Sequence, residues 1–294
     1  MVRDRAARSL ARKEGVHVPV LREMLRSSGR AARYGACSAL QHLGAESRPA
    51  VGDLIACLES EDRVLRRHAI KALGTTDDME AVTALFRMAA REFPGDRYDI
   101  VRRYIADALF GPRDSLVEKS RTLTDRKLLL AATRRFLQSI TGHCRTAIAQ
   151  NAAQTLSFAE VKALWPELDA ACNTTATTYN TAINMTTLQL MARYHIEEGV
   201  DRCVWYLTNM RGHGSQDRVP KVLQILLEYG AHAKRTVPRL KEVAEYFEER
   251  EEDFPKNLSI KKGKAVRETI RLLEAMDPKQ KADVQLISIT RQRP

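Results

Sequence analysis

The sequence is poor in residues that interrupt regular structure and poor in aromatic side chains. Its 294 residues include 14 glycines and 10 prolines, and aromatic residues make up 6%. Because 44% of the residues are apolar and 29% are charged, the composition excludes a disordered chain and supplies the side chains of a long core. No apolar run approaches the ~18 residues that cross a bilayer. We therefore expect a folded protein without membrane insertion.

Cysteines are few and have no disulfide or metal-binding spacing. They are Cys37, Cys57, Cys144, Cys172 and Cys203, an odd number without a Cys-x-x-Cys pair. We interpret them as small buried apolar side chains in a reducing compartment. The arginine-rich N-terminal residues lead into no apolar core of a secretory signal. For a free-standing chain this predicts a cytoplasmic location, whereas for a piece of a larger protein the missing signal has no meaning.

Signatures of catalysis and of metal binding are also missing. No histidine has a second histidine or a cysteine at the spacing of helical metal ligands. The adjacent His143 and Cys144 would point about 100° apart on a helix, which disfavours a shared metal. A glycine-rich phosphate loop, a Gly-x-Ser-x-Gly turn and the kinase motifs are absent as well. The sequence therefore predicts no enzyme, no metal and no cofactor.

Three segments share one pattern, in which a proline is followed by apolar residues at fixed offsets. Pro19 precedes Leu21, Met24 and Leu25; Pro49 precedes Val51, Leu54, Ile55 and Leu58; Pro238 precedes Leu240, Val243, Ala244 and Phe247. Proline fits the first turn of a helix, and the apolar residues form a stripe of period 3.6. The preceding segments close with Leu43-Gly44 and Tyr229-Gly230, typical helix ends. The pattern predicts helix pairs, which must stack to bury their apolar faces.

The second helix of each expected pair carries a recurring set of residues. Asp62 to Gly74 and Asp99 to Gly111 share an N-cap aspartate, a valine, an arginine, an alanine and a closing glycine, and Asp217 to Gly230 is a third copy. These residues resemble the HEAT-repeat family, in particular its short bacterial form of about thirty residues. The register places Leu73, with Leu43 and Phe110, on the buried seam between pairs.

The resemblance implies an all-α fold, a right-handed α-solenoid of about seven stacked antiparallel helix pairs. It further implies one domain over residues 1–294, with regular repeats in 1–112, divergent repeats in 113–200 and C-terminal repeats in 201–294. Arg5 to Leu10 matches a second helix that lacks its first. We therefore expect a neighbouring domain upstream or an atypical packing of the first helix.

The middle of the chain departs from the repeat pattern. Leu116 to Leu137 and Thr146 to Trp165 remain helical by their apolar spacing. Cys172 to Thr187 is rich in threonine and asparagine, which lowers helix propensity at its start. We predict a loop here, followed by a helix from about Ala182 to His195. A strand built on threonine and tyrosine is the alternative.

Positive charge is in excess and recurs at one repeat position. The net charge is +11, and aligning the second helices places Arg3, Arg66, Arg103 and Lys221 at equivalent positions, with Ala36 interrupting the series. HEAT solenoids usually carry their second helices on the concave surface, so the resemblance implies a basic inner groove. Alternatively, the charged runs are solvated helix faces with i,i+4 pairs, or these arginines bind carbonyl groups and acids of neighbouring repeats such as Asp107.

One loop collects polar side chains that could bind a ligand. Its candidate site residues are Arg211, His213, Ser215 and Asp217, and two glycines lie between them. The alternative interpretation is a glycine-rich connection into a helix that Asp217 caps.

The function that the sequence favours is a non-catalytic scaffold, part of a larger protein, that presents a basic groove to an acidic partner protein. The alternative is a nucleic-acid-binding protein, including the HEAT-like class that excises alkylated bases from DNA. That class uses aromatic residues and an aspartate in a basic groove, whereas Trp165 and Trp205 fit core positions better. HEAT-like enzymes with two irons carry repeated His-Glu pairs, and this sequence has no such pair.

Overall fold

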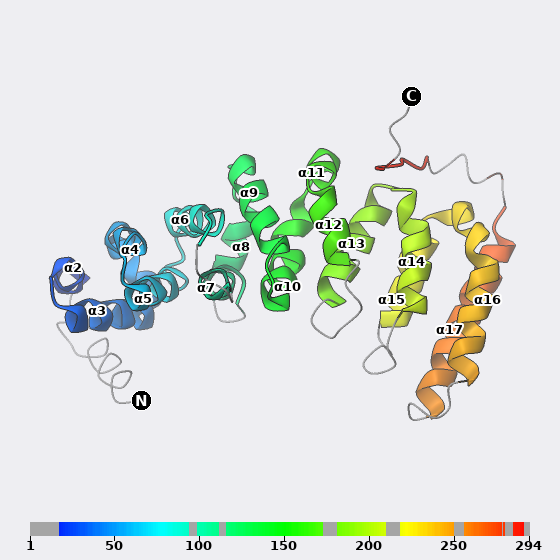
Figure 1. The fold of residues 1–294 in the computed structure, drawn as a ribbon, viewed down its shortest axis with the longest axis horizontal. Coiled ribbons are helices and arrows are strands. Elements are labelled where there is room, and N and C mark those ends of the chain that lie inside the picture. The colour runs from blue at the N-terminus through cyan, green and yellow to red at the C-terminus, as the bar shows by residue number, and fades with distance from the viewer. Residues whose placement is uncertain are drawn as a thin grey trace. The chain divides into compact units, whose positions relative to one another are not determined.

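The structure, a computed structural model, describes residues 18–93, 99–111, 116–172, 181–209, 218–249, 256–277, 279 and 285–290. These residues form α-helices joined by turns and short 3-10 helices, and none of them belongs to a β-strand (Figure 1). One isolated parallel bridge joins Ile196 to Ile287. The all-α prediction is therefore confirmed. The chain divides into two compact units, unit 1 (residues 1–156) and unit 2 (residues 157–294).

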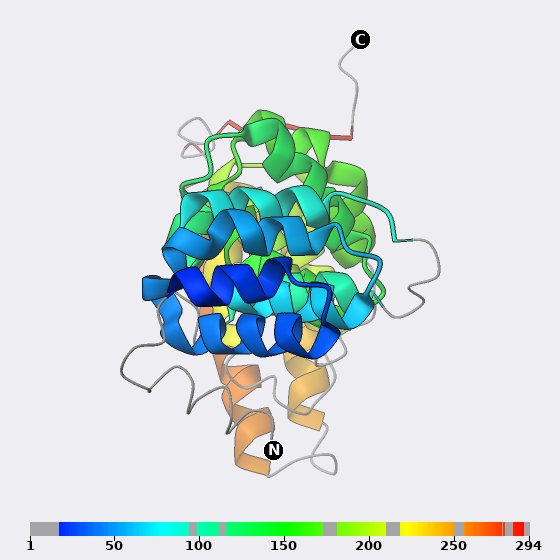
Figure 2. The ribbon, with the colours of Figure 1, turned by 90° about the vertical axis from the view of Figure 1, so that its left-hand side faces the viewer.

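Unit 1 is built from two layers of helices. Its elements are α2 (Val18–Arg26), α3 (Arg30–Leu43), η1 (Gly44–Ala50), α4 (Val51–Leu58), α5 (Arg63–Leu73), α6 (Met79–Ala89), α7 (Ile100–Phe110), α8 (Leu116–Arg121), α9 (Arg126–Leu137), α10 (Gly142–Gln150) and η2 (Ala152–Thr155). Contacts run from α3 to α5, α7 and α10 in one layer, and from α2 to α4, α6 and α9 in the other. Figure 2 shows the blue-to-cyan helices in successive rows. Successive helix pairs thus cover one another's apolar faces.

Several helix ends in unit 1 lie where the sequence predicts them. α3 ends at Leu43, and Gly44 follows with a φ of 60°, a left-handed conformation that only glycine adopts without steric cost. α5 begins after Asp62, whose carboxylate accepts hydrogen bonds from the backbone N–H groups of Val64 and Leu65. Leu73 is fully buried, as predicted, while Leu43 and Phe110 are half-buried.

Asp99 does not form the predicted cap. It adopts a left-handed φ of 50° and its side chain makes no capping hydrogen bond. Its carboxylate instead pairs with the buried guanidinium of Arg102 at 2.5 Å. Arg102 stands in α7 where Leu65 stands in α5. Because the positive charge of Arg102 lies at a core position, it pairs with the Asp99 carboxylate. That carboxylate therefore does not accept a hydrogen bond from the backbone N–H groups at the start of α7.

The two middle stretches are helical but interrupted. Residues 116–137 divide into α8 and α9, because Asp125 caps the second helix by accepting a 3.0 Å hydrogen bond from the backbone N–H of Leu128. In the stretch 146–165, α10 ends at Gln150 and η2 follows. Ser157 and Glu160 then form a capping box that starts a new helix. Local cap residues thus divide apolar stripes that look continuous in sequence.

Unit 2 consists of α11 (Phe158–Ala163), α12 (Trp165–Cys172), α13 (Thr181–Arg193), α14 (Glu198–Thr208), α15 (Arg218–Leu227), η3 (Gly230–Thr236), α16 (Val237–Glu249) and α17 (Lys256–Ala275). The helix predicted from about Ala182 is present as α13, and the loop residues 173–180 lie outside the described residues. Gly230 has a φ of 56°, in agreement with the predicted helix end. The apolar stripe after Pro238 is buried along α16. Trp205 packs against this core while partly exposed, and Trp165 is half-buried at the start of α12.

The C-terminal segment 285–290 binds to the start of α14. The Ile287 N–H donates to the His195 carbonyl at 2.9 Å, and the Glu197 N–H donates to the Ile287 carbonyl at 3.0 Å. The Glu198 carboxylate accepts hydrogen bonds from the Ser288 hydroxyl at 2.6 Å and from the Thr290 N–H at 3.0 Å. Burial by itself would raise the pKa of Glu198, but the hydrogen bonds from Ser288 and Thr290 lower it to about 2.

Candidate binding groove between α5 and α7

A cavity of about 580 Å³ lies between α5 and α7 in unit 1. The N-terminal turns of both helices line it, together with the end of α4, Met88 near the end of α6, and the residues 91–93 that follow α6. Its apolar surface includes Ile70, Met88 and Val101. Val64 and Ile100 also line it and remain 40% and 45% exposed. Isolated exposed apolar residues are common, but two that face one cavity from adjacent helices form a surface suited to a ligand.

Arginines surround this apolar surface, and we call the site the basic groove. Arg63, Arg66 and Arg67 line it from α5, and Arg91 lines it from the segment after α6. The three α5 arginines share one helix face because they are spaced i, i+3 and i+4. No carboxylate in the described part of the chain pairs with any of these three. Their charge is therefore available to an anionic ligand.

Two of the α5 arginines are held in place by neutral partners. Arg66 donates a hydrogen bond from Nη1 to the carbonyl oxygen of Ser60. The Arg67 guanidinium lies 5.8 Å from the centre of the Tyr104 ring, and the Lys71 ammonium lies 5.5 Å from the same centre. Contacts of this kind orient a cation over an aromatic face without neutralising it. The groove therefore has an oriented positive wall.

The buried side chain of Arg102 holds in place the other wall of the groove, which the segment after α6 forms. Its Nε donates to the Ala89 carbonyl at 3.2 Å, and its Nη2 donates to the Arg91 carbonyl. Its guanidinium also lies 5.4 Å from the centre of the Phe93 ring. These contacts fix the segment that carries Arg91 and Phe93 into the groove. Arg102 is thus a positioning residue that does not itself line the cavity.

Acidic residues at the rim of the groove are already paired. Arg91 binds Glu59 at 2.8 Å, and this hydrogen bond lowers the pKa of Glu59. Glu92 pairs with Arg135 at 2.7 Å. The pairing leaves the arginines of α5 as the uncompensated charges of the site.

The imidazole of His68 lies close to the positive charges of α5, and its pKa is affected by them. It stacks on Tyr34 with ring centres 5.6 Å apart, on the α3 side of α5. Burial lowers the pKa of His68, and the charges of Arg67 and Lys71 lower it further. His68 therefore adds no charge near neutral pH, and the basic character of the region comes from its arginines and Lys71.

The predicted basic series is only partly assembled at this site. Arg66 lines the basic groove. Arg103 is exposed on α7 but does not line it, and Lys221 is exposed on α15 in unit 2. The other predicted residues lie outside the described part of the chain, namely Arg3 and the loop residues Arg211, His213, Ser215 and Asp217.

The sequence prediction missed most of the groove. Arg63 and Arg67 could have been found from their i, i+4 spacing around Val64, an apolar residue on a charged helix face. Arg91 and Tyr104 could not, because only the packing of α6 and α7 against α5 brings them to the site.

Other kinds of site are not evident in the described residues. Within them, no cluster of three or more histidine, cysteine, aspartate or glutamate side chains could hold a metal ion. Likewise, no described helix has both the length and the hydropathy to cross a membrane. The sequence matches no model of a known protein family and no curated protein. The geometry of the groove is therefore the basis for a functional proposal.

Proposed function

We propose that the chain is a non-catalytic interaction module whose basic groove binds an acidic segment of a partner protein. The observation that carries this proposal is the row of α5 arginines without a carboxylate partner, beside an exposed apolar surface. A segment with both carboxylates and apolar side chains satisfies both features of the groove.

Size and rigidity favour the same kind of ligand. A cavity of about 580 Å³ accommodates several side chains and lies within the usual range of ligand sites, ~300–1,000 Å³. Its walls are formed largely by packed helices, so binding costs little ordering of the protein. The arginines would increase the association rate of an acidic partner and orient it.

We also propose that the helix pairs belong to a right-handed, HEAT-like α-solenoid. The two helix layers of unit 1 and the recurrence of the Asp-x-Val-x-Arg pattern support this proposal. Small-angle X-ray scattering tests it, since a solenoid gives the profile of an elongated, curved particle. A profile of one compact globule would contradict it.

Nucleic-acid binding is the second candidate function. The net charge of +11 and the Tyr104 ring beneath two cations favour it, because phosphates seek positive charge and bases stack on aromatic rings. The salt dependence of binding affinity distinguishes the two functions. A nucleic-acid complex that depends on several phosphate contacts weakens by roughly a thousandfold or more when salt rises from about 50 to about 200 mM, whereas apolar contacts in a protein complex persist.

Charge reversal in the groove tests the proposed function. Fluorescence anisotropy would measure binding of labelled acidic peptides containing apolar residues, with a short DNA duplex as the alternative ligand. Arg63→Glu and Arg66→Glu should each weaken peptide binding by about tenfold or more, while Arg87→Glu, an exposed arginine on α6 outside the groove, should leave it unchanged.

Arg103→Glu separates the groove from the basic series predicted by sequence. Because Arg103 does not line the cavity, its reversal should have little effect on peptide binding. Equal losses for Arg66→Glu, Arg103→Glu and Arg87→Glu would mean that net charge, and not the groove, attracts the ligand. Circular dichroism of each variant would establish that the helices are intact.

A further inference from the structure

The C-terminal segment 285–290 is held at the start of α14 in the way that a bound peptide is held. Ile287 forms the isolated parallel bridge with Ile196. Its N–H donates to the His195 carbonyl at 2.9 Å, and its carbonyl accepts from the Glu197 N–H at 3.0 Å. An extended segment that pairs with exposed backbone groups in this way is a common mode of peptide recognition.

The backbone that receives the segment has an unusual conformation. His195 has a left-handed φ of 49°. Its N–H donates to the Ala192 carbonyl at 2.9 Å, and the Ile196 N–H donates to the Met191 carbonyl at 2.8 Å, which closes α13. A left-handed residue other than glycine persists only where its surroundings require it. Here the turn aligns the His195 carbonyl and the Glu197 N–H with the segment.

Side chains of the segment contact the protein at alternate positions. Leu286 is partly buried and packs against the core of unit 2. The half-buried Ser288 donates its hydroxyl to Glu198 at 2.6 Å. Ile287, which lies between them, is 40% exposed. This is the alternation of an extended chain, so the site contacts every second side chain.

Glu198 accepts uncharged donors of the segment only at neighbouring positions. Besides the Ser288 hydroxyl, these are the Thr290 hydroxyl at 2.5 Å, the Ile289 N–H at 3.1 Å and the Thr290 N–H at 3.0 Å. Glu198 is the first residue of α14, where the helix dipole stabilises a carboxylate. A carboxylate or phosphate in place of the Ser288 hydroxyl would repel Glu198. The site therefore favours neutral hydroxyl residues and disfavours acidic ones.

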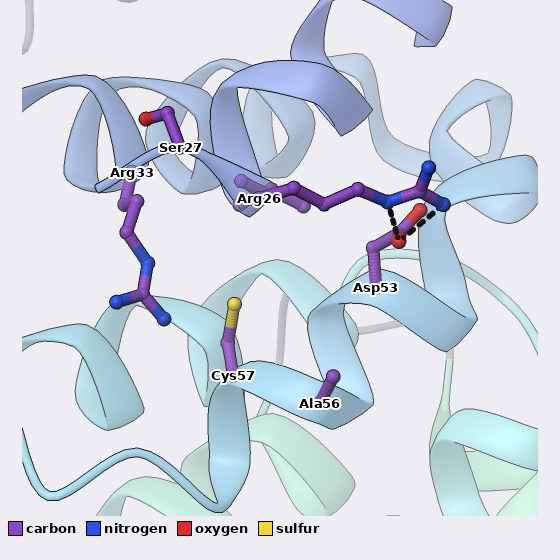
Figure 3. A pocket seen from close by; sticks show the side chains of 7 residues that line it. Arg26, Ser27, Arg33, Asp53, Ala56 and Cys57 are labelled. Carbon is purple, nitrogen blue, oxygen red and sulfur yellow. Dashed lines mark hydrogen bonds and ion pairs between the residues drawn. The ribbon is translucent and has the colours of Figure 1, made fainter. Parts of the chain in front are cut away.

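A carboxylate of unit 1 shows the contrast with an internal structural contact. Asp53 lines a cavity of about 360 Å³ and accepts hydrogen bonds from Arg22 at 2.6 Å and from Arg26 at 2.8 Å (Figure 3). Its partners are two cations of the neighbouring helix α2. Glu198 forms no ion pair with a lysine or arginine of the described residues. Its carboxylate is therefore satisfied by a segment that few buried contacts hold.

We propose that the start of α14 is a peptide-binding site and that the C-terminal segment is its intramolecular ligand. The ligand supplied by a partner protein is an extended segment with an apolar residue followed by hydroxyl residues at the second and fourth positions after it. Such a segment displaces residues 285–290 and takes over their hydrogen bonds. The site is separate from the basic groove of unit 1, which takes acidic segments, so either can fail without the other.

Binding of a labelled peptide with the sequence of residues 285–290 tests the proposal. The full chain carrying Ser288→Ala and Thr290→Val weakens its own segment and frees Glu198. Fluorescence anisotropy should show that the peptide binds this variant at least about tenfold more tightly than the wild type, because a linked segment competes at high effective concentration. A peptide with the same two substitutions, or with Ser288→Asp, should bind the variant about tenfold more weakly or worse.

Carboxylate variants locate the site on the protein. Adding Glu198→Gln to the opened chain should weaken peptide binding by about tenfold, because a charged acceptor is lost. Asp201→Asn is the matched control on the same helix. It removes an exposed carboxylate that pairs with Arg235 at 2.9 Å and should leave peptide binding unchanged. Circular dichroism of each variant would establish that the helices are intact.

A second measurement uses the wild-type chain and depends on no variant. An excess of the unlabelled peptide should speed hydrogen exchange at the chain's own Ile289 and Thr290 amides, and the peptide without hydroxyls should not. Equal effects of both peptides, or no binding at about 1 mM peptide, the range of effective concentration of a linked segment, would overturn the proposal. A wild-type dimer that Glu198→Gln dissociates would also overturn it, because the occupant would then be a second copy of the chain.

Discussion

Gly199 on α14 lies directly against the buried ring of Tyr229. A Cβ atom on Gly199 would overlap the Tyr229 hydroxyl and would lie 2.9 Å from the ring carbon Cζ and 2.8 Å from the Cβ of Met191. Tyr229 is fully buried. The close approach of α14 to this ring therefore requires glycine at position 199.

Gly199→Ala should destabilise unit 2 by about 1–3 kcal/mol, because overpacking forces a packed ring or a helix to move. Urea unfolding followed by circular dichroism measures the change. Gly35→Ala is the matched control, since a Cβ at this helical position in α3 would meet no atom within 4 Å. Equal stability of Gly199→Ala and the wild type would contradict the packing described here.

Tyr229→Phe should leave stability unchanged or raise it. The buried Tyr229 hydroxyl has no hydrogen-bond partner among the described residues, and burial raises its pKa, so the phenol is uncharged and unsatisfied. Removing the hydroxyl also removes the closest overlap with a Cβ at position 199. The cost of Gly199→Ala should accordingly be smaller in the Tyr229→Phe background, which a double-mutant cycle would measure.

Leu73→Ala should cost about 2–5 kcal/mol, as truncation of a fully buried leucine does. Leu73 closes α5 and has no exposed surface. Ile140→Ala is the control in the same unit, because Ile140 is 64% exposed and surface truncations change stability by about 0.5 kcal/mol or less. If both variants unfold at the same urea concentration, the register of α5 is wrong.

Asp99→Ala should destabilise unit 1 by about 3–5 kcal/mol, because it leaves the buried Arg102 charge without its partner. The further change Arg102→Leu should recover part of this loss, since leucine occupies the equivalent position 65 in α5. Recovery should be incomplete because the carbonyls of Ala89 and Arg91 lose their donor. Thermal unfolding of both variants measures this, and no recovery would argue against a core position for Arg102.

Glu198 should hold the C-terminal segment in a pH-dependent way. Its pKa is lowered to about 2 in the folded protein, against ~4.3 in an unfolded chain. A lowered pKa contributes stability above about pH 4.3, and this contribution is lost as the pH falls toward 2. Hydrogen exchange at the Ile289 and Thr290 amides, which donate to Glu198, should therefore be slow near neutral pH and faster in Glu198→Gln.

Glu197→Gln is the control for this prediction. Its backbone N–H still binds the Ile287 carbonyl, while its own carboxylate lies 3.6 Å from Arg235. Protection of Ile289 and Thr290 should be the same as in the wild type. If Glu197→Gln and Glu198→Gln lose protection equally, the carboxylate of Glu198 does not hold the segment.

Local sequence signals account for most of the helical framework. Gly44, Gly230 and the Asp62 cap act within one helix turn, so the residues nearest in sequence decide them. The same holds for the apolar stripes of α4 and α16, whose period already defines a buried face. Two features depart from these local signals. The Asp99 carboxylate pairs with Arg102 and does not cap α7. Cap residues before α9 and α11 divide apolar stripes that look continuous in the sequence.

The sequence by itself determined that the chain is helical, where many helices end, and which faces are buried, because these depend on contacts between residues at most four positions apart. Only the tertiary structure decided that Arg91 and Tyr104 line one cavity with the arginines of α5 and that Gly199 meets Tyr229. Each of these pairings joins different helices. Their distances depend on how helix faces pack, and a periodic sequence allows many such packings.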